Sequence, residues 1–136
     1  EAKLVEIRFV NDLEDRAWSR LGQILGGNSH MEELVIQSCP VNMAELCVGL
    51  QFNQSIKKLR LNGIDLGDER LNSLVPFLSH NPSLRSLILK ESNIGSTAVD
   101  SLSDALVQRS EDSCLEVLNL SNNHIGDMDL EKLAPA

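Results

Sequence analysis

Apolar positions along the chain recur in one short pattern that is found five times. The pattern reads apolar-x-x-apolar-x-apolar, and its copies begin at Leu4, Met31, Ile56, Leu84 and Leu115. The successive starts are separated by 27, 25, 28 and 31 residues. Spacings of this size are typical of solenoid repeats, in which each repeat forms one structural unit. The pattern therefore predicts about five units stacked along one axis.

Each copy alternates in the way that a β-strand does. In the last copy, Leu118 and Leu120 are apolar and alternate with the outward positions Val117 and Asn119. A period of two predicts a strand with one buried face. The polar turn that follows ends at Asp127, which we expect to cap a helix.

The segments between the copies change to helical spacing. Three apolar stripes recur at intervals of three and four residues: Ala17, Leu21, Ile24 and Leu25; Leu71, Leu74, Val75 and Leu78; and Ala98, Leu102, Ala105 and Leu106. Such stripes predict helices with one buried face. We interpret Gly26 and Gly27 as the signal that ends the first of these helices.

The predicted fold is an α/β solenoid of about five strand-turn-helix units. Its parallel strands form a concave sheet, and its helices cover the convex side. One unit cannot bury its own apolar edge, whereas a stack of units can. A chain of 136 residues suits a single repeat domain spanning 1–136. It begins without Met and stops inside a helical pattern at 130–133, so we expect a piece of a longer protein.

Two segments, 118–127 and 81–87, resemble the ribonuclease-inhibitor type of leucine-rich repeat. The resemblance extends from about Leu4 to Leu133 and implies a horseshoe arc. Ribonuclease inhibitor, Ran GTPase-activating proteins, innate immune receptors and tropomodulin-like actin regulators share this repeat, so the resemblance implies binding but no particular partner. In the family an Asn, Cys or Thr after the strand bonds to the turn; here that position holds Asp12, Cys39, Ile64, Ser92 and Asn123. Ile64 cannot make this bond, and with Glu14 in an apolar position the first unit is degenerate.

Charge and cysteine content exclude several classes of function. The net charge of −8 argues against binding to nucleic acid or to an anionic membrane surface. No apolar run reaches the length of a membrane-spanning helix. Cys39, Cys47 and Cys114 form no CxxC pair, which indicates reduced thiols in an intracellular, cytoplasmic protein.

No constellation of residues predicts catalysis. His30, His80 and His124 are assigned to separate loops and have no carboxylate or thiol at metal-ligand spacing. Phosphate loops, dinucleotide fingerprints and nucleophile elbows are absent from the sequence. We therefore predict no enzyme, no cofactor and no metal. Glycosylation sequons at Asn53 and Asn119 are discounted, since Asn119 lies within a strand and the thiols indicate the cytosol.

Outward strand positions offer one candidate site. Aligning the five copies gives rows on the concave face: Glu6, Arg8 and Val10; Glu33, Val35 and Gln37; Lys58, Arg60 and Asn62; Ser86, Ile88 and Lys90; and Val117, Asn119 and Ser121. Five of the 12 basic residues lie on or beside the third and fourth strands. The predicted partner-binding residues are Lys58, Arg60, Asn62, Arg85, Ile88, Lys90, Val35 and Asn119. The alternative is a solvated strand face that Glu91 and Glu116 balance.

Three functions follow from these patterns. The first is a scaffold that binds a partner protein on the concave face. The second is a regulator or docking module for a small GTPase, with Asn93 or Asn123 presented in a strand-to-helix loop. The third is a structural span of a longer solenoid, which self-associates through uncapped ends at Leu118, Leu130 and Leu133.

Overall fold

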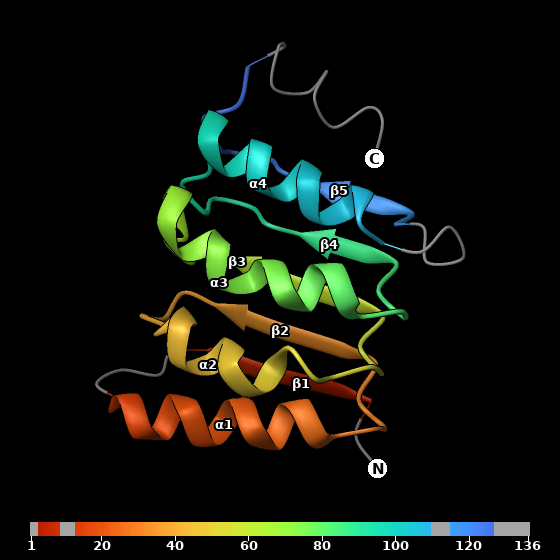
Figure 1. Cartoon of the computed structure of the whole chain (residues 1–136). Helices are drawn as coiled ribbons and strands as arrows, with labels where there is room; N and C mark the ends of the chain where they lie inside the picture. The colour runs from red at the N-terminus through yellow and green to blue at the C-terminus, as the bar shows by residue number, and fades with distance from the viewer. Residues whose placement is uncertain (1–2, 9–12, 110–114, 127–136) are drawn as a thin grey trace.

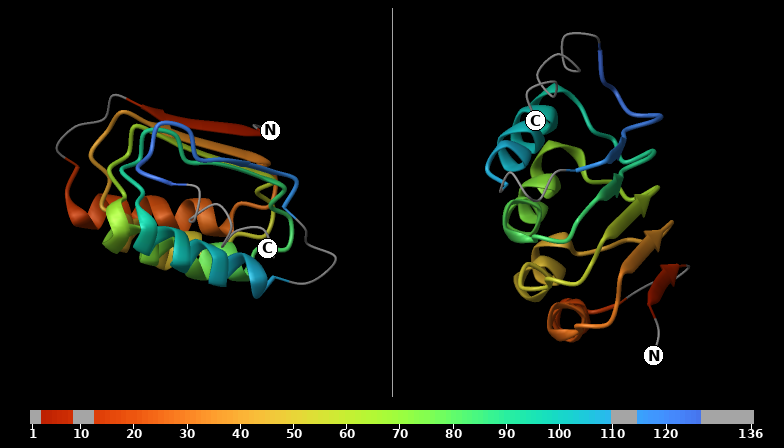
Figure 2. Two further views of the ribbon diagram at one scale, coloured as in Figure 1. Left: turned by 90° about the horizontal axis from the view of Figure 1, so that it is seen from above. Right: turned by 90° about the vertical axis from the view of Figure 1, so that its right-hand side faces the viewer.

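The computed structural model describes residues 3–8, 13–109 and 115–126, apart from the side chains of Arg8 and Asp68. Strands and helices alternate along these residues as β1 (Leu4–Arg8), α1 (Asp15–Gly27), β2 (Glu33–Gln37), α2 (Met43–Leu50), β3 (Lys58–Asn62), α3 (Gly67–His80), β4 (Ser86–Ile88), α4 (Ser96–Val107) and β5 (Val117–Asn119). The strands form one parallel sheet in the order β1-β2-β3-β4-β5. The sheet lies on one side of the molecule and the helices on the other (Figures 1 and 2). The predicted α/β solenoid is confirmed.

Strand register confirms the alignment of four copies and corrects the first. Glu33, Lys58, Ser86 and Val117 lie side by side on β2 to β5, as their spacing predicts. Leu4, however, is paired with Glu33 and not with Met31. The first copy is therefore displaced by two residues. Because side chains alternate with a period of two, this shift leaves Glu6 and Ile7 on their predicted faces. The prediction is wrong for Leu4, which was aligned with the buried Met31 but is 51% exposed.

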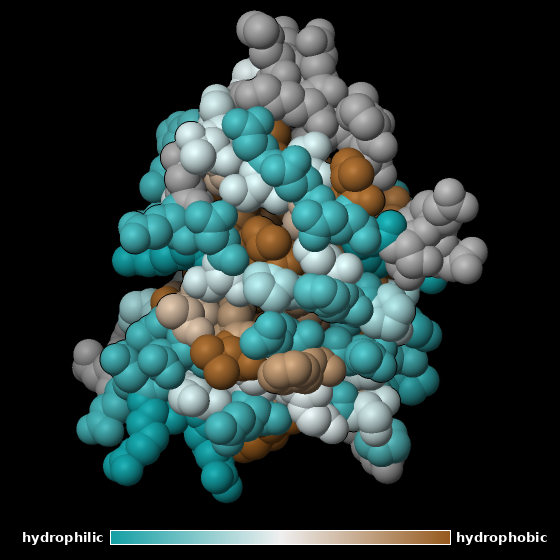
Figure 3. Space-filling view, viewed as in Figure 1, coloured by the Kyte–Doolittle hydropathy of each residue, from teal (hydrophilic) through white to brown (hydrophobic). Residues whose placement is uncertain are grey.

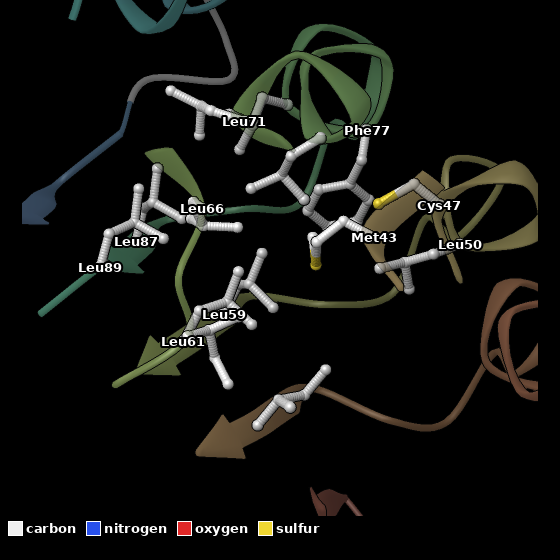
Figure 4. Packing of buried hydrophobic residues seen from close by; sticks show 14 of the residues in the cluster. Met43, Cys47, Leu50, Leu59, Leu61, Leu66, Leu71, Phe77, Leu87 and Leu89 are labelled. Atoms are coloured by element: carbon white, nitrogen blue, oxygen red, sulfur yellow. The ribbon is translucent and has the colours of Figure 1, made fainter. Parts of the chain in front are cut away.

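Buried aliphatic side chains of both layers form one core. Figure 4 shows Leu59 and Leu61 of β3 pointing toward the helix layer, where Phe77 of α3 lies against Met43 and Cys47 of α2. The apolar stripe predicted on α4 is buried, and on α3 only Val75 remains partly exposed. These stripes are confirmed as the helix faces that pack on the sheet.

The stripe predicted on α1 is wrong at Ile24, whose side chain is 57% exposed. Trp18 and Leu25 occupy the buried face of α1. At 3.6 residues per turn, Ile24 lies about 200° around the helix from Gly22 and Gly26, which face α2. Ile24 is therefore on the side of α1 that points away from the neighbouring helix.

The helix α1 ends at Gly27, as the Gly26-Gly27 pair predicts, but the structure shows another reason for Gly26. The helix continues through Gly27, and the residue after it, Asn28, has extended backbone angles (φ −76°, ψ 125°). A Cβ on Gly26 would collide with the carbonyl oxygen of Gly49 on α2. The glycine is therefore required by the close approach of two helix backbones.

The turns after the strands repeat in their geometry. In four units the second residue after the last strand leucine or isoleucine has a positive φ: Ser38, Gly63, Glu91 and Asn122. One residue further along, Ser92 Oγ donates to the carbonyl of Leu61 at 3.0 Å, and Asn123 Nδ2 donates to that of Leu120 at 3.0 Å. The predicted turn bonds are thus confirmed at these two positions. Ile64 is buried there as an apolar filler, while Asp12 and Asp127 lie outside the described residues.

An asparagine ladder joins the helix-to-strand corners, and the sequence analysis did not detect it. Asn28, Asn53 and Asn81 occupy equivalent corners, and the Oδ1 atom of each accepts two backbone N–H groups. Asn53 Nδ2 donates to the carbonyl of Asn28, and Asn81 Nδ2 to that of Asn53. The ladder links consecutive units, and it buries Asn53, the first residue of the sequon, completely.

Candidate functional site

The outer surface of the sheet, on the side away from the helices, is called the sheet face below. Pairing of the strands places Val35, Arg60, Ile88 and Asn119 in one row across β2 to β5. Lys58 lies in the next row, and Asn62 lies at the end of β3 beside Gln37. Arg85 directly precedes β4, and Lys90 follows it by two residues. The structure thus gathers the predicted partner-binding residues on and beside four adjacent strands, β2 to β5.

The two apolar members of that row are buried although they point outward. Val35 is 4% exposed and Ile88 is 8% exposed, whereas Val117 at the end of the sheet is 48% exposed. Arg60 stands between Val35 and Ile88 in the register, and neighbouring parallel strands are only about 4.8 Å apart. Long arginine side chains cover apolar neighbours with their methylene groups. The apolar centre of the predicted site therefore flanks Arg60 on both sides, and this position between Val35 and Ile88 is called the slot below.

Several cations elsewhere are already paired within the protein. Lys57 forms an ion pair with Glu32 at 3.3 Å, and Arg70 forms one with Asp65 at 3.5 Å. Arg85 Nη1 donates to the Pro82 carbonyl at 3.3 Å, and Arg109 donates to two carbonyls. The contacts of Lys57 and Arg109 join neighbouring units, whereas Arg70 and Arg85 bond within their own units. All four cations are thereby less available to a ligand.

Three cations of the sheet face are not paired. The side chains of Lys58, Arg60 and Lys90 are partly buried, and no hydrogen bond or ion pair joins them to the described part of the chain. Arg60 Nε and Asn62 Oδ1 are both excluded from solvent without a hydrogen-bond partner among these residues. A buried polar atom is normally satisfied, and Ser79 Oγ of α3 lacks a partner among the described residues in the same way.

The first strand adds acidic character to the sheet face. Because of its two-residue displacement, β1 places Leu4, Glu6 and Arg8 beside Glu33, Val35 and Gln37. This corrects the alignment that placed Glu6 with Glu33, and Val10 lies outside the described residues. The face thus carries Glu6 and Glu33 on its first two strands, and Lys58 and Arg60 on the third.

None of the three histidines lies in a metal-binding cluster within the described ranges. His30, His80 and His124 are all exposed, and no group of three or more His, Cys, Asp or Glu side chains gathers in this part of the chain. His80 is the last residue of α3 and not a loop residue. Its Nδ1 lies 2.8 Å from the Pro76 carbonyl, as is common for a side chain that satisfies a helix end.

Two of the three cysteines lie within the described residues. Cys39 and Cys47 are buried thiols that form no disulfide there, as expected for small core side chains, and Cys114 lies outside the described residues. Burial raises the pKa of Cys47 to about 12, so its thiol stays protonated and unreactive near neutral pH. A cytoplasmic location remains a prediction. Within the described ranges, no helix combines the length and apolar character needed to cross a bilayer.

The two loop asparagines considered for GTPase regulation have different roles. Asn123 is engaged by the turn: its Nδ2 donates to the carbonyl of Leu89, and its Oδ1 accepts the N–H groups of Ser92 and Ile94. Asn93 is exposed, has a φ of 57°, and donates to Asp65 Oδ1 at 3.2 Å. Asn123 therefore has a structural explanation that is complete without a ligand.

The helix side carries exposed apolar residues that the sequence patterns did not single out. Figure 3 shows isolated apolar patches on a mainly hydrophilic surface. Val48 of α2 and the nearby Phe52 are strongly exposed, with Phe52 at 72%. Val48 lies in the last turn of α2, and Phe52 lies in the turn that follows the helix. The alternation of strand residues could not have revealed them.

Comparison with known proteins gives matches to leucine-rich repeats. The family model described as "Leucine Rich repeat" matches residues 80–103 and 111–134. The chain is 30% identical over 116 residues to a Tonsoku-like protein of Danio rerio, covering 84% of this chain and 8% of that protein.

Two further relatives carry the repeat in their names. Leucine-rich repeat-containing protein 45 of Gallus gallus is 30% identical over 119 residues, covering 85% of this chain and 18% of that protein. The NACHT, LRR and PYD domains-containing protein 12 of Mus musculus is 33% identical over 139 residues, covering 96% and 13%. The chain thus spans less than a fifth of the length of each of these curated relatives.

Proposed function

Because the chain is a leucine-rich repeat protein, and such repeats are in general protein-interaction modules, we propose that its sheet face docks a partner protein. The partner contacts Lys58, Arg60, Asn62, Lys90 and the row around them. The single observation that carries the proposal is that three cations, two on β3 and one just after β4, have no partners among the described residues, in a chain of net charge −8.

Docking by this surface requires no catalytic group of the chain itself. Opposite charges across an interface mainly accelerate association and select the partner. The outward residues of parallel strands form contiguous rows, which suit an extended or flat partner surface. The proposal is therefore a binding scaffold and not an enzyme.

Charge reversal tests this proposal. We expect the double variant Lys58→Glu/Arg60→Glu to bind its partner with roughly a hundredfold lower affinity. Like charges would then slow association and destabilise the docked complex. The measurement is an interaction screen with the whole chain as bait, followed by titration of each partner that is found. Matching urea midpoints would show that the variants are folded.

Arg16→Glu/Arg20→Glu is the matched control, since it makes the same charge change at two exposed positions of α1. This control should retain every partner. If the sheet-face variant instead captured all partners as the wild type does, the sheet face would not be the docking surface. Equal losses in both variants would mean that only net charge matters, and would also reject the proposal.

A second proposal, compatible with the first, is that the chain is one span of a longer solenoid. It is supported by exposed apolar residues at the β1 and α1 edge, where Leu4 is 51% exposed and Ile24 is 57% exposed. A further repeat stacked on this edge would cover both. Leu118 is partly buried at the other end, and Leu130 and Leu133 lie outside the described residues.

Sedimentation velocity tests the exposed edge. At concentrations of about 100 μM we expect reversible self-association of this chain, which Ile24→Ser should weaken because burial of an isoleucine side chain is worth about 2 kcal/mol. Val48→Ser, at an equally exposed apolar position on the helix side, is the control and should leave the association unchanged. A strict monomer at that concentration would show that the apolar edge at β1 and α1 does not drive self-association.

A further inference from the structure

We propose that the partner presents a carboxylate to Arg60, so that the sheet face recognises an acidic segment of the partner. This inference rests on the sheet-face docking proposed above. It goes further by naming the chemical group that is recognised and the residue that recognises it.

The position of Arg60 carries the argument. Its side chain stands in the row between Val35 and Ile88, both of which are almost completely buried. Its Nε is excluded from solvent, and no acceptor among the described residues reaches it. A donor that has lost its water without gaining an acceptor is unfavourable. A partner's acceptor would remove that penalty when the Arg60 side chain, which is partly exposed, turns its Nε outward on binding.

The chemistry of the guanidinium group selects the acceptor. Nε–H and one Nη–H point in parallel and match the two oxygens of a carboxylate, which a single carbonyl oxygen cannot do. The apolar walls lower the local dielectric and strengthen such a pair. They also offer contact to the methylene groups of a glutamate side chain. The slot therefore fits an acidic side chain better than a neutral one.

Asn62 indicates how the rest of the segment would lie. It is two residues further along β3 and on the same face, and its buried Oδ1 lacks a donor among the described residues. A backbone N–H of an extended chain would supply that donor when the partly exposed Asn62 side chain turns outward on binding. The segment would thus place a carboxylate on Arg60 and a backbone amide on Asn62, a spacing of two residues along the strand.

The charges around the slot set the limits of the acidic segment. Lys58 and Lys90 flank it without partners of their own in the described part of the chain. Glu6 and Glu33 occupy the first two strands of the same face. Repulsion from these glutamates confines acidic residues of the partner to the region above β3 and β4, so recognition depends on position as well as on net charge.

The test uses the whole chain and three synthetic peptides of eight residues. One peptide alternates Glu with Ala, the second alternates Gln with Ala, and the third alternates phosphoserine with Ala. The readout is the Nε–Hε NMR cross-peak of Arg60, assigned by its loss in Arg60→Lys, together with the side-chain amide signals of Asn62. We expect the Glu peptide to shift these signals in a salt-sensitive manner and the Gln peptide to leave them unchanged.

Two variants separate the shape of the guanidinium from its charge. Arg60→Lys keeps the charge but removes the paired donors, and it should lower the affinity for the Glu peptide about tenfold. Lys58→Gln removes a charge but leaves the guanidinium, and it should lower the affinity for the Glu peptide only about twofold to threefold. Equal effects of the two variants would show that the peptide is bound by charge alone and would overturn the inference.

The remaining outcomes also decide the matter. Binding of the phosphoserine peptide alone, or equal binding of the Gln peptide, would mean that a carboxylate is not the recognised group. Failure of the Glu peptide to shift the Arg60 signal would likewise overturn carboxylate recognition. If partner capture were nevertheless lost in Lys58→Glu/Arg60→Glu, the docking proposal would stand without it. If neither experiment gave its expected result, both proposals would fall.

Discussion

Replacing Gly22 with alanine is expected to lower the free energy of unfolding by about 3 kcal/mol, the upper end of the usual range for overpacking. A Cβ at this position would collide with the carbonyl oxygen of Leu46 on α2. The same collision occurs from the other helix at Gly49, where a Cβ would lie 2.5 Å from the backbone N of Gln23 and the backbone C of Gly22. Backbone atoms cannot rotate away as side chains can, so α1 and α2 would have to separate.

Urea unfolding followed by circular dichroism provides the measurement for Gly22→Ala. Gly27→Ala is the matched control, because it also lies on α1 and no other atom comes within 4 Å of a Cβ placed there. The control should be unchanged or slightly more stable, since alanine favours the helix. Equal midpoints for the two variants would show that the close approach of α1 and α2 does not limit stability.

Replacing Asn53 with alanine is expected to lower the free energy of unfolding by a similar amount, about 3 kcal/mol or more. The side chain is fully buried, and its Nδ2 donates to the carbonyls of Leu25 at 2.8 Å and Asn28 at 3.0 Å. Its Oδ1 accepts the N–H groups of Ser55 and Ile56. Each backbone group left unpaired in the interior costs about 1–3 kcal/mol, and the ladder between two units would be broken.

The adjacent Gln54→Ala is the control for this second variant, because Gln54 is exposed. It should unfold at nearly the wild-type denaturant concentration. Asn53→Asp should be destabilised about as much as Asn53→Ala. The aspartate keeps the acceptor oxygen but places a second carboxylate oxygen against the carbonyl oxygens of Leu25 and Asn28. If Asn53→Ala and Gln54→Ala unfolded at the same urea concentration, the ladder would not contribute to the stability of the stacked units.

The candidate site was predictable in its membership but not in its chemistry. Alternation along β3 and β4 placed Lys58, Arg60 and Ile88 on one face, and the pairing of the strands agrees. Whether a basic side chain is paired depends on residues far away in sequence: Lys57 meets Glu32, whereas Arg60 meets no acidic group among the described residues. The burial of Val35 and Ile88 likewise depends on what stands on the adjacent strands.

The sequence by itself determined the class of fold, the number of strands and the inner and outer face of each strand. These properties follow from periods of 2 and 3.6 residues, which are local and can be read along one dimension. Only the tertiary structure decided the two-residue displacement of β1, because a shift by one full period of a strand changes no face.

The tertiary structure also decided the roles of the glycines and asparagines. Gly26 suits a helix end when it is considered alone, yet the backbone of α2 is what requires it. Asn28, Asn53 and Asn81 are common turn residues individually and become a ladder only when the units are stacked. Close approach, pairing and burial are properties of neighbours in three dimensions, and in a solenoid those neighbours are about one repeat apart along the chain.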